Sequence, residues 1–300
     1  MKHIITFENS RPTEPLHGWM LYTEGDSSRN PHYIRLYEKA CEHCKMSIKL
    51  GLYHPSVLFS DKKEAIRQLR ELLDLETPGY VVNRTRDYHL AELLESMGIR
   101  VFNNSQIARL GNDKSEAYRY MQKRAIPVMP TVYSIQTPPP WYPAVVKSCD
   151  GHGGTEVFYI SDASAWTNWK KEWLQKSDHP RSKKRYLIQQ AASDPGKDVR
   201  VYIVGNKIKA AVLRTSSTDF RSNYCLGGKI QLHRLSAKEQ ELVNRTIQGL
   251  SIDMAGIDFI YHHGQWVFNE IEDMAGARSL YSLTDYDIVH DYIKHIHKEL

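Results

Sequence analysis

The chain has 300 residues, of which 41% are hydrophobic and 25% are charged, with a formal net charge of +5. This length allows two domains or one large α/β unit, and no run approaches the roughly 20 apolar residues of a membrane-spanning helix. The first residues lack the apolar run of a secretory signal, so a cytoplasmic protein is expected. Lys and Arg are scattered except in the run RSKKR at Arg181–Arg185, and a nucleic-acid binder, which needs a basic stripe or a reading motif, has the least support.

Residues 1 to about 105 alternate strand and helix signals. Short apolar runs predict strands at His3–Phe7, Ser56–Phe59, Gly79–Val82 and Val101–Phe102. Helical periodicity predicts helices at Tyr33–Leu50, Asp61–Leu75 and Tyr88–Met97. This alternation implies a parallel sheet with helices on both faces.

The centre of the chain reads as a small α+β module. Asn112–Asp113 has the chemistry of a helix N-cap, supported by Glu116, and predicts a helix from Lys114 to about Lys123. A proline-rich linker follows. Beyond it the pattern predicts strands at Tyr142–Lys147, Glu156–Ile160 and Tyr186–Gln190, and a helix at Ala163–Lys176.

Two hairpins and two helices are predicted for the last hundred residues. Gly205–Asn206 separates the apolar runs Val199–Val204 and Lys207–Arg214, and Gly264 lies between Gly256–Tyr261 and Trp266–Glu272. Glycine and asparagine between apolar runs are a strong hairpin signal. The predicted helices are Ser236–Leu250 and Ser282–Leu300.

Cys41 and Cys44 have the CxxC spacing that some zinc sites use. A structural zinc site normally needs a second such pair, which the sequence lacks. Both residues fall in a predicted amphipathic helix, so reduced cysteines are the favoured interpretation.

Lys147 and the turn GHGG at 151–154 have the chemistry of a phosphate site. Glycines let backbone N–H groups approach phosphate oxygens, and lysine adds a positive charge. The spacing matches neither a P-loop nor a dinucleotide fingerprint. By itself the motif is weak, because most such runs are only tight hairpin turns.

Three acidic residues near the C-terminus predict a cation site. Glu270 and Glu272 are two apart, so in a strand they share a face. If the hairpin loop holds the three residues 263–265, Asp258 lies directly opposite Glu270, whereas a two-residue loop would put it on the other face. The alternative is an exposed edge strand with its acids in water. A metal site is favoured, because Asp258 lies in an otherwise apolar strand where a free carboxylate is costly.

Arg221 and Asn223 lie two apart in DFRSNYCLGG at 219–228. Arginine can clamp an anion through two hydrogen bonds. Taken alone, an ordinary polar surface loop is the better interpretation of this segment.

Taken in order, these segments resemble the ATP-grasp carboxylate–amine ligases. The resemblance is carried by Lys114 opening a helix, and by VVKSCDGHGG, YLIQQAA, KDVRVYIVGNKIKAAVLR, DFRSNYCLGG, AGIDFI and FNEIEDMAGA. Their order and approximate spacing follow the family over nearly the whole chain. The pattern is closest to the glutamate ligases that extend a ribosomal protein's tail, with glutathione synthetase and D-alanine–D-alanine ligase further off.

The resemblance implies an ATP-grasp fold of α/β and α+β parts. Residues 1–108 would form an N-terminal parallel-sheet domain. Residues 109–192 would form a central subdomain with a glycine-rich lid loop, and residues 193–300 a C-terminal subdomain with the metal site.

The resemblance also implies how ATP and magnesium bind. The nucleotide-contacting residues would be Lys114, Lys147, Gly151, Gly153, Gly154, Gln190, Ala191, Asp198, Arg221, Ser222 and Asn223. Among them the lysines would contact phosphates, the glycines would close over them, and Gln190–Ala191 would touch adenine through backbone groups. Asp258, Glu270 and Glu272 would hold two magnesium ions, with manganese as an alternative.

In such a ligase the substrate carboxylate attacks the γ-phosphate, and an amine then displaces phosphate from the acylphosphate to form an amide. Arg200, Arg214 and Arg278 are candidates for the remaining anionic groups, with a surface role equally open for each. The expected partners are a small-molecule or peptide carboxylate and an amine, without nucleic acid or membrane; a homo-oligomer stays open. The alternatives are an ATP-grasp kinase and a non-catalytic nucleotide-binding protein.

The sequence departs from the family pattern at the hinge and near the metal ligands. Gln190–Ala191 stands where the family has Glu and an aromatic or apolar residue, and Glu272 where it has Asn. Met274–Gly276 replaces the usual Pro-Gly, and Leu226 a basic residue. An unusual substrate pocket is therefore expected.

Overall fold

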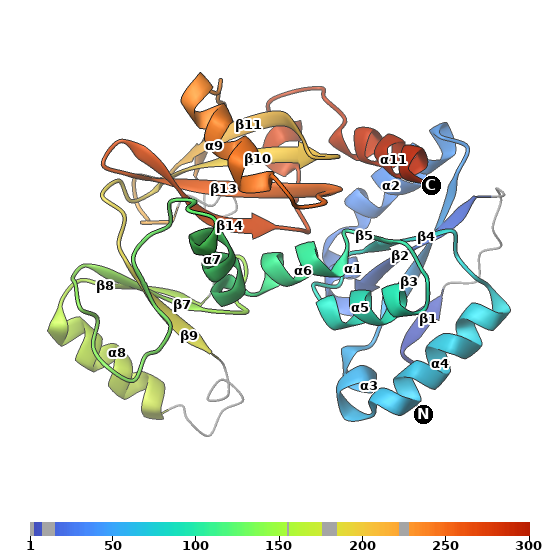
Figure 1. The fold of residues 1–300 in the computed structure, drawn as a ribbon, viewed down its shortest axis with the longest axis horizontal. Coiled ribbons are helices and arrows are strands. Elements are labelled where there is room, and N and C mark those ends of the chain that lie inside the picture. The colour runs from blue at the N-terminus through green and yellow to red at the C-terminus, as the bar shows by residue number, and fades with distance from the viewer. Residues whose placement is uncertain (1–2, 8–15, 155, 176–184, 222–227) are drawn as a thin grey trace.

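The computed structural model describes residues 3–7, 16–154, 156–175, 185–221 and 228–300. They fold into three β-sheets with helices packed around them. Figure 1 shows the first sheet on one side of the molecule and the other two on the opposite side, with α6 between the two sides. The sheets span residues 5–102, 131–190 and 197–272, within the three segments proposed from the sequence; the division into domains stays a proposal.

The N-terminal sheet has the order β1-β3-β2-β4-β5. Its strands are β1 (Ile5–Phe7), β2 (His17–Thr23), β3 (Ser47–Tyr53), β4 (Tyr80–Asn83) and β5 (Val101–Phe102). Strands β2 to β5 are parallel, which confirms a parallel sheet and two of its predicted strands, Gly79–Val82 and Val101–Phe102. The strand predicted at His3–Phe7 is present as β1, but it runs antiparallel to β3 at the edge of the sheet, against the expectation. The helices are α1 (Glu24–Arg29), α2 (Pro31–His43), α3 (Pro55–Ser60), α4 (Lys62–Leu75), α5 (Tyr88–Ser96) and α6 (Ser105–Asn112).

Two predicted elements in this sheet domain were wrong, and one strand was missed. The helix predicted over Tyr33–Leu50 stops at the end of α2, and its last residues belong to β3. The strand predicted at Ser56–Phe59 is part of α3, where Pro55 presets the helical φ and lacks an N–H that the first turn would leave unbonded. Strand β2 was not predicted, although it lies at the centre of the sheet.

The central sheet is antiparallel, in the order β6-β9-β7-β8. Its strands are β6 (Thr131–Val132), β7 (Ala144–Ser148), β8 (Val157–Ile160) and β9 (Tyr186–Gln190), with helices α7 (Lys114–Lys123) and α8 (Ala163–Gln175). The predicted N-cap of α7 is confirmed, because the Asp113 carboxylate accepts a hydrogen bond from the Glu116 N–H at 3.1 Å.

The C-terminal sheet is antiparallel as well, in the order β12-β11-β10-β13-β14. Its strands are β10 (Lys197–Val204), β11 (Lys207–Thr215), β12 (Lys229–Leu232), β13 (Met254–His262) and β14 (Gln265–Glu272). Helix α9 (Ala237–Ile247) lies between β12 and β13 in the chain, and α10 (Arg278–Tyr281) and α11 (Ile288–Glu299) come after β14. Both predicted hairpins are present, β10–β11 and β13–β14.

The β13–β14 hairpin carries a bulge that the sequence analysis did not anticipate. Its loop has two residues, His263 and Gly264, both with positive φ, not the three that were considered. A regular two-residue hairpin would oppose Asp258 to Asn269. A bulge between Asp258 and Phe259 makes Asn269 the extra residue, so that Asp258 opposes Glu270 after all.

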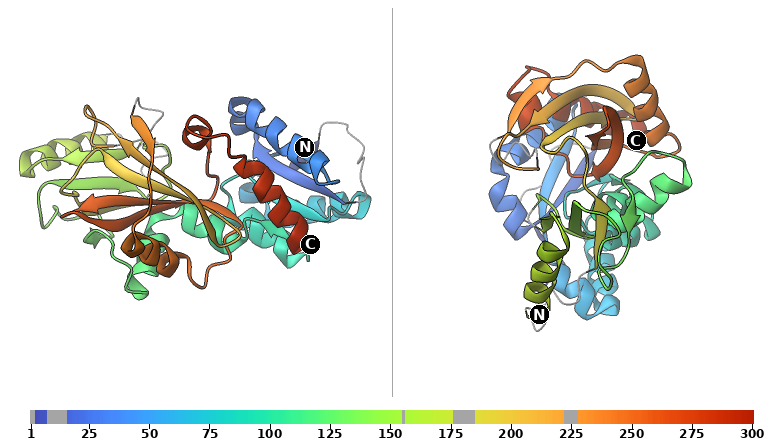
Figure 2. Two further views of the ribbon diagram at one scale, coloured as in Figure 1. Left: turned by 90° about the horizontal axis from the view of Figure 1, so that it is seen from above. Right: turned by 90° about the vertical axis from the view of Figure 1, so that its left-hand side faces the viewer.

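One hydrophobic core is built from residues near both ends of the chain. Helix α11 packs on α2, and one buried cluster joins Met20 and Tyr37 of the N-terminal sheet domain to Tyr202 of β10 and Tyr292 of α11. Figure 2 shows α11 beside the N-terminal helices rather than over the central sheet. None of the helices in the described segments has the length and apolar character that a membrane crossing requires.

A glycine-to-alanine pair tests the packing of β2. A Cβ on Gly18 would lie 2.4 Å from the Tyr80 ring, which is buried and tied to the Ser47 carbonyl at 2.9 Å. We expect Gly18→Ala to lower the free energy of unfolding by about 1–3 kcal/mol in urea denaturation. The control is Gly25→Ala in α1, where the nearest atom is 3.7 Å away and alanine adds up to about 1 kcal/mol. Equal stability of the two variants would contradict this packing.

Candidate active site

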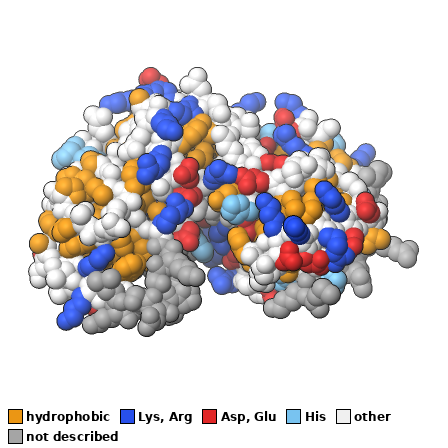
Figure 3. Space-filling model, turned by 60° about the horizontal axis from the view of Figure 1, so that its bottom comes forward, with side chains coloured by type: hydrophobic (Ala, Val, Ile, Leu, Met, Phe, Trp, Pro, Cys, Tyr) orange, Lys and Arg blue, Asp and Glu red, His pale blue; other side chains and the backbone are white. Residues whose placement is uncertain are grey.

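A cleft opens between the central and C-terminal sheets, with about 900 Å³ of empty space including its mouth. Figure 3 shows side chains of both charges gathered around the hollow between the two sides of the molecule. The predicted site residues that line the cleft are Lys114, Lys147, Gly151, Gly153, Gly154, Gln190, Ala191, Asp198, Arg221 and Glu270. Ser222 and Asn223 lie outside the described residues.

Two lysines converge at one end of the cleft. Lys147, on β7, is 9% exposed and donates to the Asn269 amide oxygen at 2.9 Å and to the Tyr118 hydroxyl at 3.3 Å. Burial lowers its pKa from 10.5 to about 8, against the opposing effect of Glu270. Lys114, the first residue of α7, donates to the Gly151 carbonyl and lies 3.5 Å from the Glu270 carboxylate.

The glycine-rich turn at 151–154 lies next to these lysines, and its Gly151 carbonyl accepts the hydrogen bond from Lys114. Gly153 and Gly154 both have positive φ, and nothing lies within 4 Å of a Cβ placed on Gly153. Arg221 reaches across the cleft to donate to the Gly154 carbonyl at 2.6 Å, and it is oriented by Asp219. The turn can therefore approach a ligand closely while being held from both sides.

The hinge at Gln190–Ala191 has its two backbone N–H groups bonded within the protein. The Gln190 N–H donates to the Pro130 carbonyl and the Ala191 N–H to the Pro143 carbonyl, each at 3.0 Å. These two donors are therefore engaged within the protein, and a base at the hinge would meet the carbonyl side of this strand end. The apolar side chains of Met129, Val145 and Ile260 line the same cleft.

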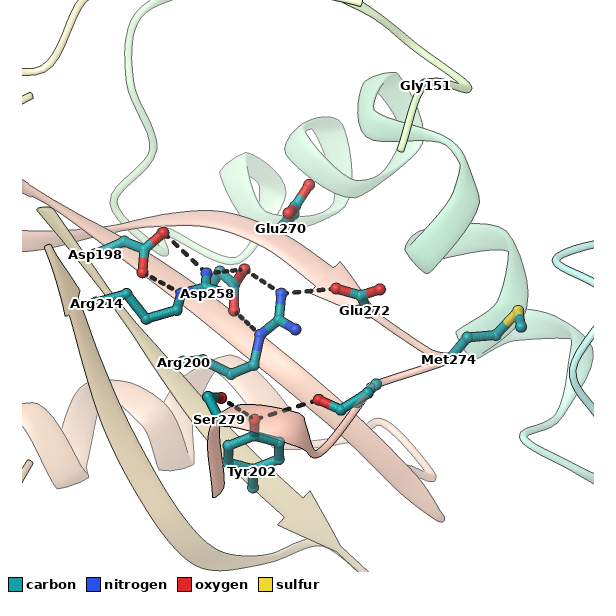
Figure 4. Close-up of polar contacts among 12 residues, drawn as sticks. Gly151, Asp198, Arg200, Tyr202, Arg214, Asp258, Glu270, Glu272, Met274 and Ser279 are labelled. Atoms are coloured by element: carbon teal, nitrogen blue, oxygen red, sulfur yellow. Dashed lines mark hydrogen bonds and ion pairs between the residues drawn. The ribbon is translucent and has the colours of Figure 1, made fainter. Parts of the chain in front are cut away.

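Buried charges form a network across β10, β11 and β13, beside the cleft. Arg200 clamps both oxygens of Asp258, at 2.8 and 2.7 Å, and its Nη2 lies 2.6 Å from the Glu272 carboxylate. Arg214 clamps Asp198 at 2.6 and 2.9 Å and reaches Asp258 at 2.7 Å. Figure 4 shows these five side chains in one connected row, with Glu270 turned away from it.

The arginines decide the charge state of Asp258, which is only 1% exposed. Burial by itself would raise the pKa of this carboxyl. Arg200 and Arg214 outweigh that effect and hold the pKa below its ordinary value of 3.8. Asp258 is therefore ionised at neutral pH, with both oxygens already accepting hydrogen bonds.

The three predicted metal ligands are not equivalent. Within the described residues, no group of three His, Cys, Asp or Glu side chains is placed to hold a metal ion. Glu270 borders the cleft and Glu272 is half-buried, whereas Asp258 could take a cation only if an arginine released it. Arg278 begins α10 with an exposed side chain. A metal site at Asp258, Glu270 and Glu272 stays a prediction.

The sequence analysis missed Asn269, which lines the cleft and holds Lys147. A signal for it was present. Under strict alternation the core residues Trp266 and Phe268 would share a face with Glu270 and Glu272, which is physically inconsistent. A bulge between Phe268 and Glu270 removes the conflict and returns Ile271 to the core.

Comparison with known proteins agrees with this geometry. The RimK-like ATP-grasp domain matches residues 131–296. A relative from Mycoplasma pneumoniae, "Uncharacterized protein MG011 homolog", is 29% identical over 223 residues, covering 70% of this chain and 74% of the relative. "Probable alpha-L-glutamate ligase" of Haemophilus ducreyi is 22% identical over 246 residues, covering 79% of each chain. The D-alanine–D-alanine ligase of Bacillus anthracis, solved with ATP, superposes with a TM-score of 0.67 at 13% identity, covering 95% of this chain and 99% of that one.

The fold is therefore that of an ATP-grasp protein, with the cleft between its two antiparallel sheets. More narrowly, the chain belongs to the RimK-like ATP-grasp family. These findings confirm the predicted fold class. The names of the relatives support the predicted class of enzyme, an ATP-dependent carboxylate–amine ligase.

Titration of Lys147 should be visible in nucleotide binding. Its ammonium is charged below about pH 8 and loses its proton above that pH, so ATP affinity should fall as the pH rises from 8, approaching about tenfold per pH unit. ATP binding measured by calorimetry between pH 7 and 9.5 tests this. Lys147→Met should bind more weakly with a flat pH profile, whereas Lys114→Met should keep the slope. A flat profile in the unmodified protein would contradict the assignment.

Removing the Asp258 charge should destabilise the protein. Asp258→Asn leaves Arg200 and Arg214 partly unpaired, and we expect a loss of about 3–5 kcal/mol in the free energy of unfolding. Because the pKa is lowered in the folded state, the stability that ionised Asp258 contributes is present above pH 3.8 and is lost as the pH falls below it. The variant should lack this component of acid sensitivity. Asp74→Asn, at an exposed position in α4, is the control and should change neither property.

Proposed function

We propose that this protein joins a carboxylate to an amine in an ATP-dependent reaction that passes through an acylphosphate and releases ADP and phosphate. The observation that carries the proposal is the convergence of Lys114, Lys147 and Glu270 beside the glycine-rich turn, in the cleft between the two antiparallel sheets. Cations and backbone donors gathered there suit the triphosphate, whose charge must be neutralised during phosphoryl transfer.

ATP would lie along the cleft with its base at the hinge. Met129, Val145 and Ile260 would cover the faces of the ring, and the carbonyl side of Gln190–Ala191 would accept from its amino group. The phosphates would extend toward Lys147, Lys114 and the Gly153–Gly154 turn, where Arg221 adds a further positive charge. Asp198 supports this arrangement by holding Arg214, since both oxygens of its carboxylate are committed.

Glu270 and Glu272 are the residues that would hold magnesium beside the phosphates. A carboxylate pair on one strand suits a hard divalent ion, and such an ion would neutralise phosphate charge and orient the γ-phosphoryl group. Glu270 is also the nearer of the two to Lys114. Asp258 would support the site indirectly, through Arg200, unless that arginine moves.

The reaction would run in two displacements. An oxygen of the substrate carboxylate forms a bond to the γ-phosphorus while the bond to ADP breaks. The amine nitrogen then attacks the acyl carbon, and phosphate leaves with the former carboxylate oxygen. Lys147 and Lys114 would stabilise the transferred phosphoryl group, and Arg200, beside Glu272, would face the carboxylate end. Arg214 is fully committed to two aspartates and acts by holding them.

Amino acids or short peptides are the substrate class that we propose, with L-glutamate as the first candidate. The support is the name of the Haemophilus ducreyi relative, together with a cleft that has cationic groups for anionic substrates. A cytoplasmic location and action without nucleic acid or membrane remain part of the proposal.

The test is ADP release from ATP and magnesium across pairs of L-amino acids and short peptides, with L-glutamate as one partner. We expect ADP together with the mass of the condensed pair. Glu270→Gln should reduce turnover at least about 100-fold, and the control Glu241→Gln, exposed on α9, should keep it. A phosphorylated product without an amide would show a kinase, and ATP binding without ADP release in any pairing would overturn the ligase.

A further inference from the structure

The chain leaves β14 as Asp273–Gly276, and the carbonyls of these four residues each accept a hydrogen bond from a side chain. Asn103 donates to Asp273 at 2.9 Å and Arg84 to Met274 at 3.2 Å. Tyr33 donates to Ala275 at 3.1 Å and Tyr202 to Gly276 at 3.3 Å. The backbone hydrogen bonds of the β-sheet thus end at Glu272. From residue 273 on, side chains donate the hydrogen bonds that the backbone carbonyls need.

Three of the four donors come from the N-terminal sheet domain. Tyr33 lies on α2, Arg84 follows β4, and Asn103 follows β5. The segment that they hold begins directly after Glu272, at the edge of the proposed phosphoryl site. Figure 4 shows Met274 further along the same chain, past Glu272. The N-terminal domain therefore holds the segment 273–276 in place through hydrogen bonds. We call this segment, on the side of the site away from the nucleotide cleft, the wall of the site.

Arg84 is the unusual member of this set. It is 5% exposed, and no carboxylate of the described residues forms an ion pair with it. Its Nε donates to the Tyr22 hydroxyl at 3.1 Å, its Nη1 to the Tyr37 hydroxyl at 3.4 Å, and its guanidinium lies 4.9 Å from the centre of the Tyr33 ring.

Arg84 interacts electrostatically with the buried Asp273 carboxyl but forms no ion pair with it. A buried cation without an ion-pair partner is costly, and a packed apolar side chain would usually be more stable in its place. The arrangement gives the guanidinium one orientation. Two phenol oxygens and the Tyr33 ring fix its plane, and Nη2 then points at the Met274 carbonyl. A flexible or neutral side chain could not hold four neighbours in this geometry.

We propose that Arg84 and Tyr33 are positioning residues of the ligase site: they fix the segment 273–276 so that the N-terminal domain sets the place of the second, non-nucleotide substrate. None of the residues 273–277 lines the nucleotide cleft. Loss of either donor should therefore loosen this wall and weaken use of the carboxylate or amine substrate, while ATP affinity stays unchanged. The expected loss in use of the second substrate rests on the proposed function. The expected loosening of the segment does not.

The first experiment measures hydrogen exchange by mass spectrometry in the full-length protein. Tyr33→Phe removes the hydroxyl that bonds to Ala275 and keeps the ring. Arg84→Lys keeps the positive charge but loses the planar guanidinium group with its several N–H donors. Exchange reports on N–H groups, and those of residues 281–284 bond to the carbonyls of residues 277, 278 and 280, at the end of the held segment. We expect the peptide covering residues 274–284 to exchange about fivefold faster in Tyr33→Phe and faster still in Arg84→Lys, with peptides from the central sheet unchanged. The matched control is Tyr53→Phe, whose hydroxyl bonds Asp87 in the same domain, away from the segment.

The second experiment measures ATP dissociation constants, and steady-state kinetics with the substrate pair found by the ADP-release screen. We expect ATP affinity within twofold of the unmodified protein, and a KM for the second substrate raised about fivefold or more in Tyr33→Phe, with Arg84→Lys milder than Arg84→Met. Unchanged exchange at 274–284 in both variants would overturn the proposal. Equal acceleration across the whole chain would also overturn it, because it would show a general stabilising role. If no substrate pair is turned over, the ligase assignment fails, and the exchange experiment still decides this inference.

Discussion

The whole arrangement of the site depends on one extra residue in β14. A strand alternates its side chains strictly, so a regular hairpin cannot place Trp266 and Phe268 in the core and also turn Glu270 toward the cleft. The bulge at Asn269 shifts the alternation of side chains by one residue, so that the residues after it face the opposite side of the sheet from the one expected. It opposes Glu270 to Asp258, aims both Asn269 and Glu270 at the cleft, and returns Ile271 to the core. Lys147 then takes Asn269 as its partner, so the bulge also sets the environment of a buried lysine.

The second constraint is electrostatic. Three strands of the C-terminal sheet bring Asp198, Arg200, Arg214 and Asp258 onto one face, where burial would penalise each charge alone. Paired across strands, they satisfy one another, and the arginine fork matches the carboxylate geometry. Such a network contributes little net stability compared with apolar packing, but it is intolerant of the loss of one member. Its value here is orientation, because it fixes Arg200 with one nitrogen against Glu272.

Much of this could be read from the sequence, for physical reasons that differ by element. Helix α7 was predicted with its bounds because Asp113 and Glu116 define an N-terminus chemically. The hairpins were predicted because Gly205–Asn206 and Gly264 allow positive φ. Among the short apolar runs, SVLF at 56–59 was misassigned as a strand, because it fits a buried strand and a helix equally well. The commitment of Asp258 to two arginines depends on the register of three strands, which no local pattern specifies.

Helix α11 packs against α2, and Tyr33 meets Ala275 across 242 positions of sequence. This has a consequence for biosynthesis. At about 5–20 residues per second, the part of the core made by residues 20–46 waits on the order of 10 to 50 s for the partners that cover it. During that interval the apolar face of α2 and the inner face of the N-terminal sheet are exposed on a nascent chain. Long-range closure of this kind slows folding, and the apolar surface that waits for its partners is prone to aggregate until the later segments emerge.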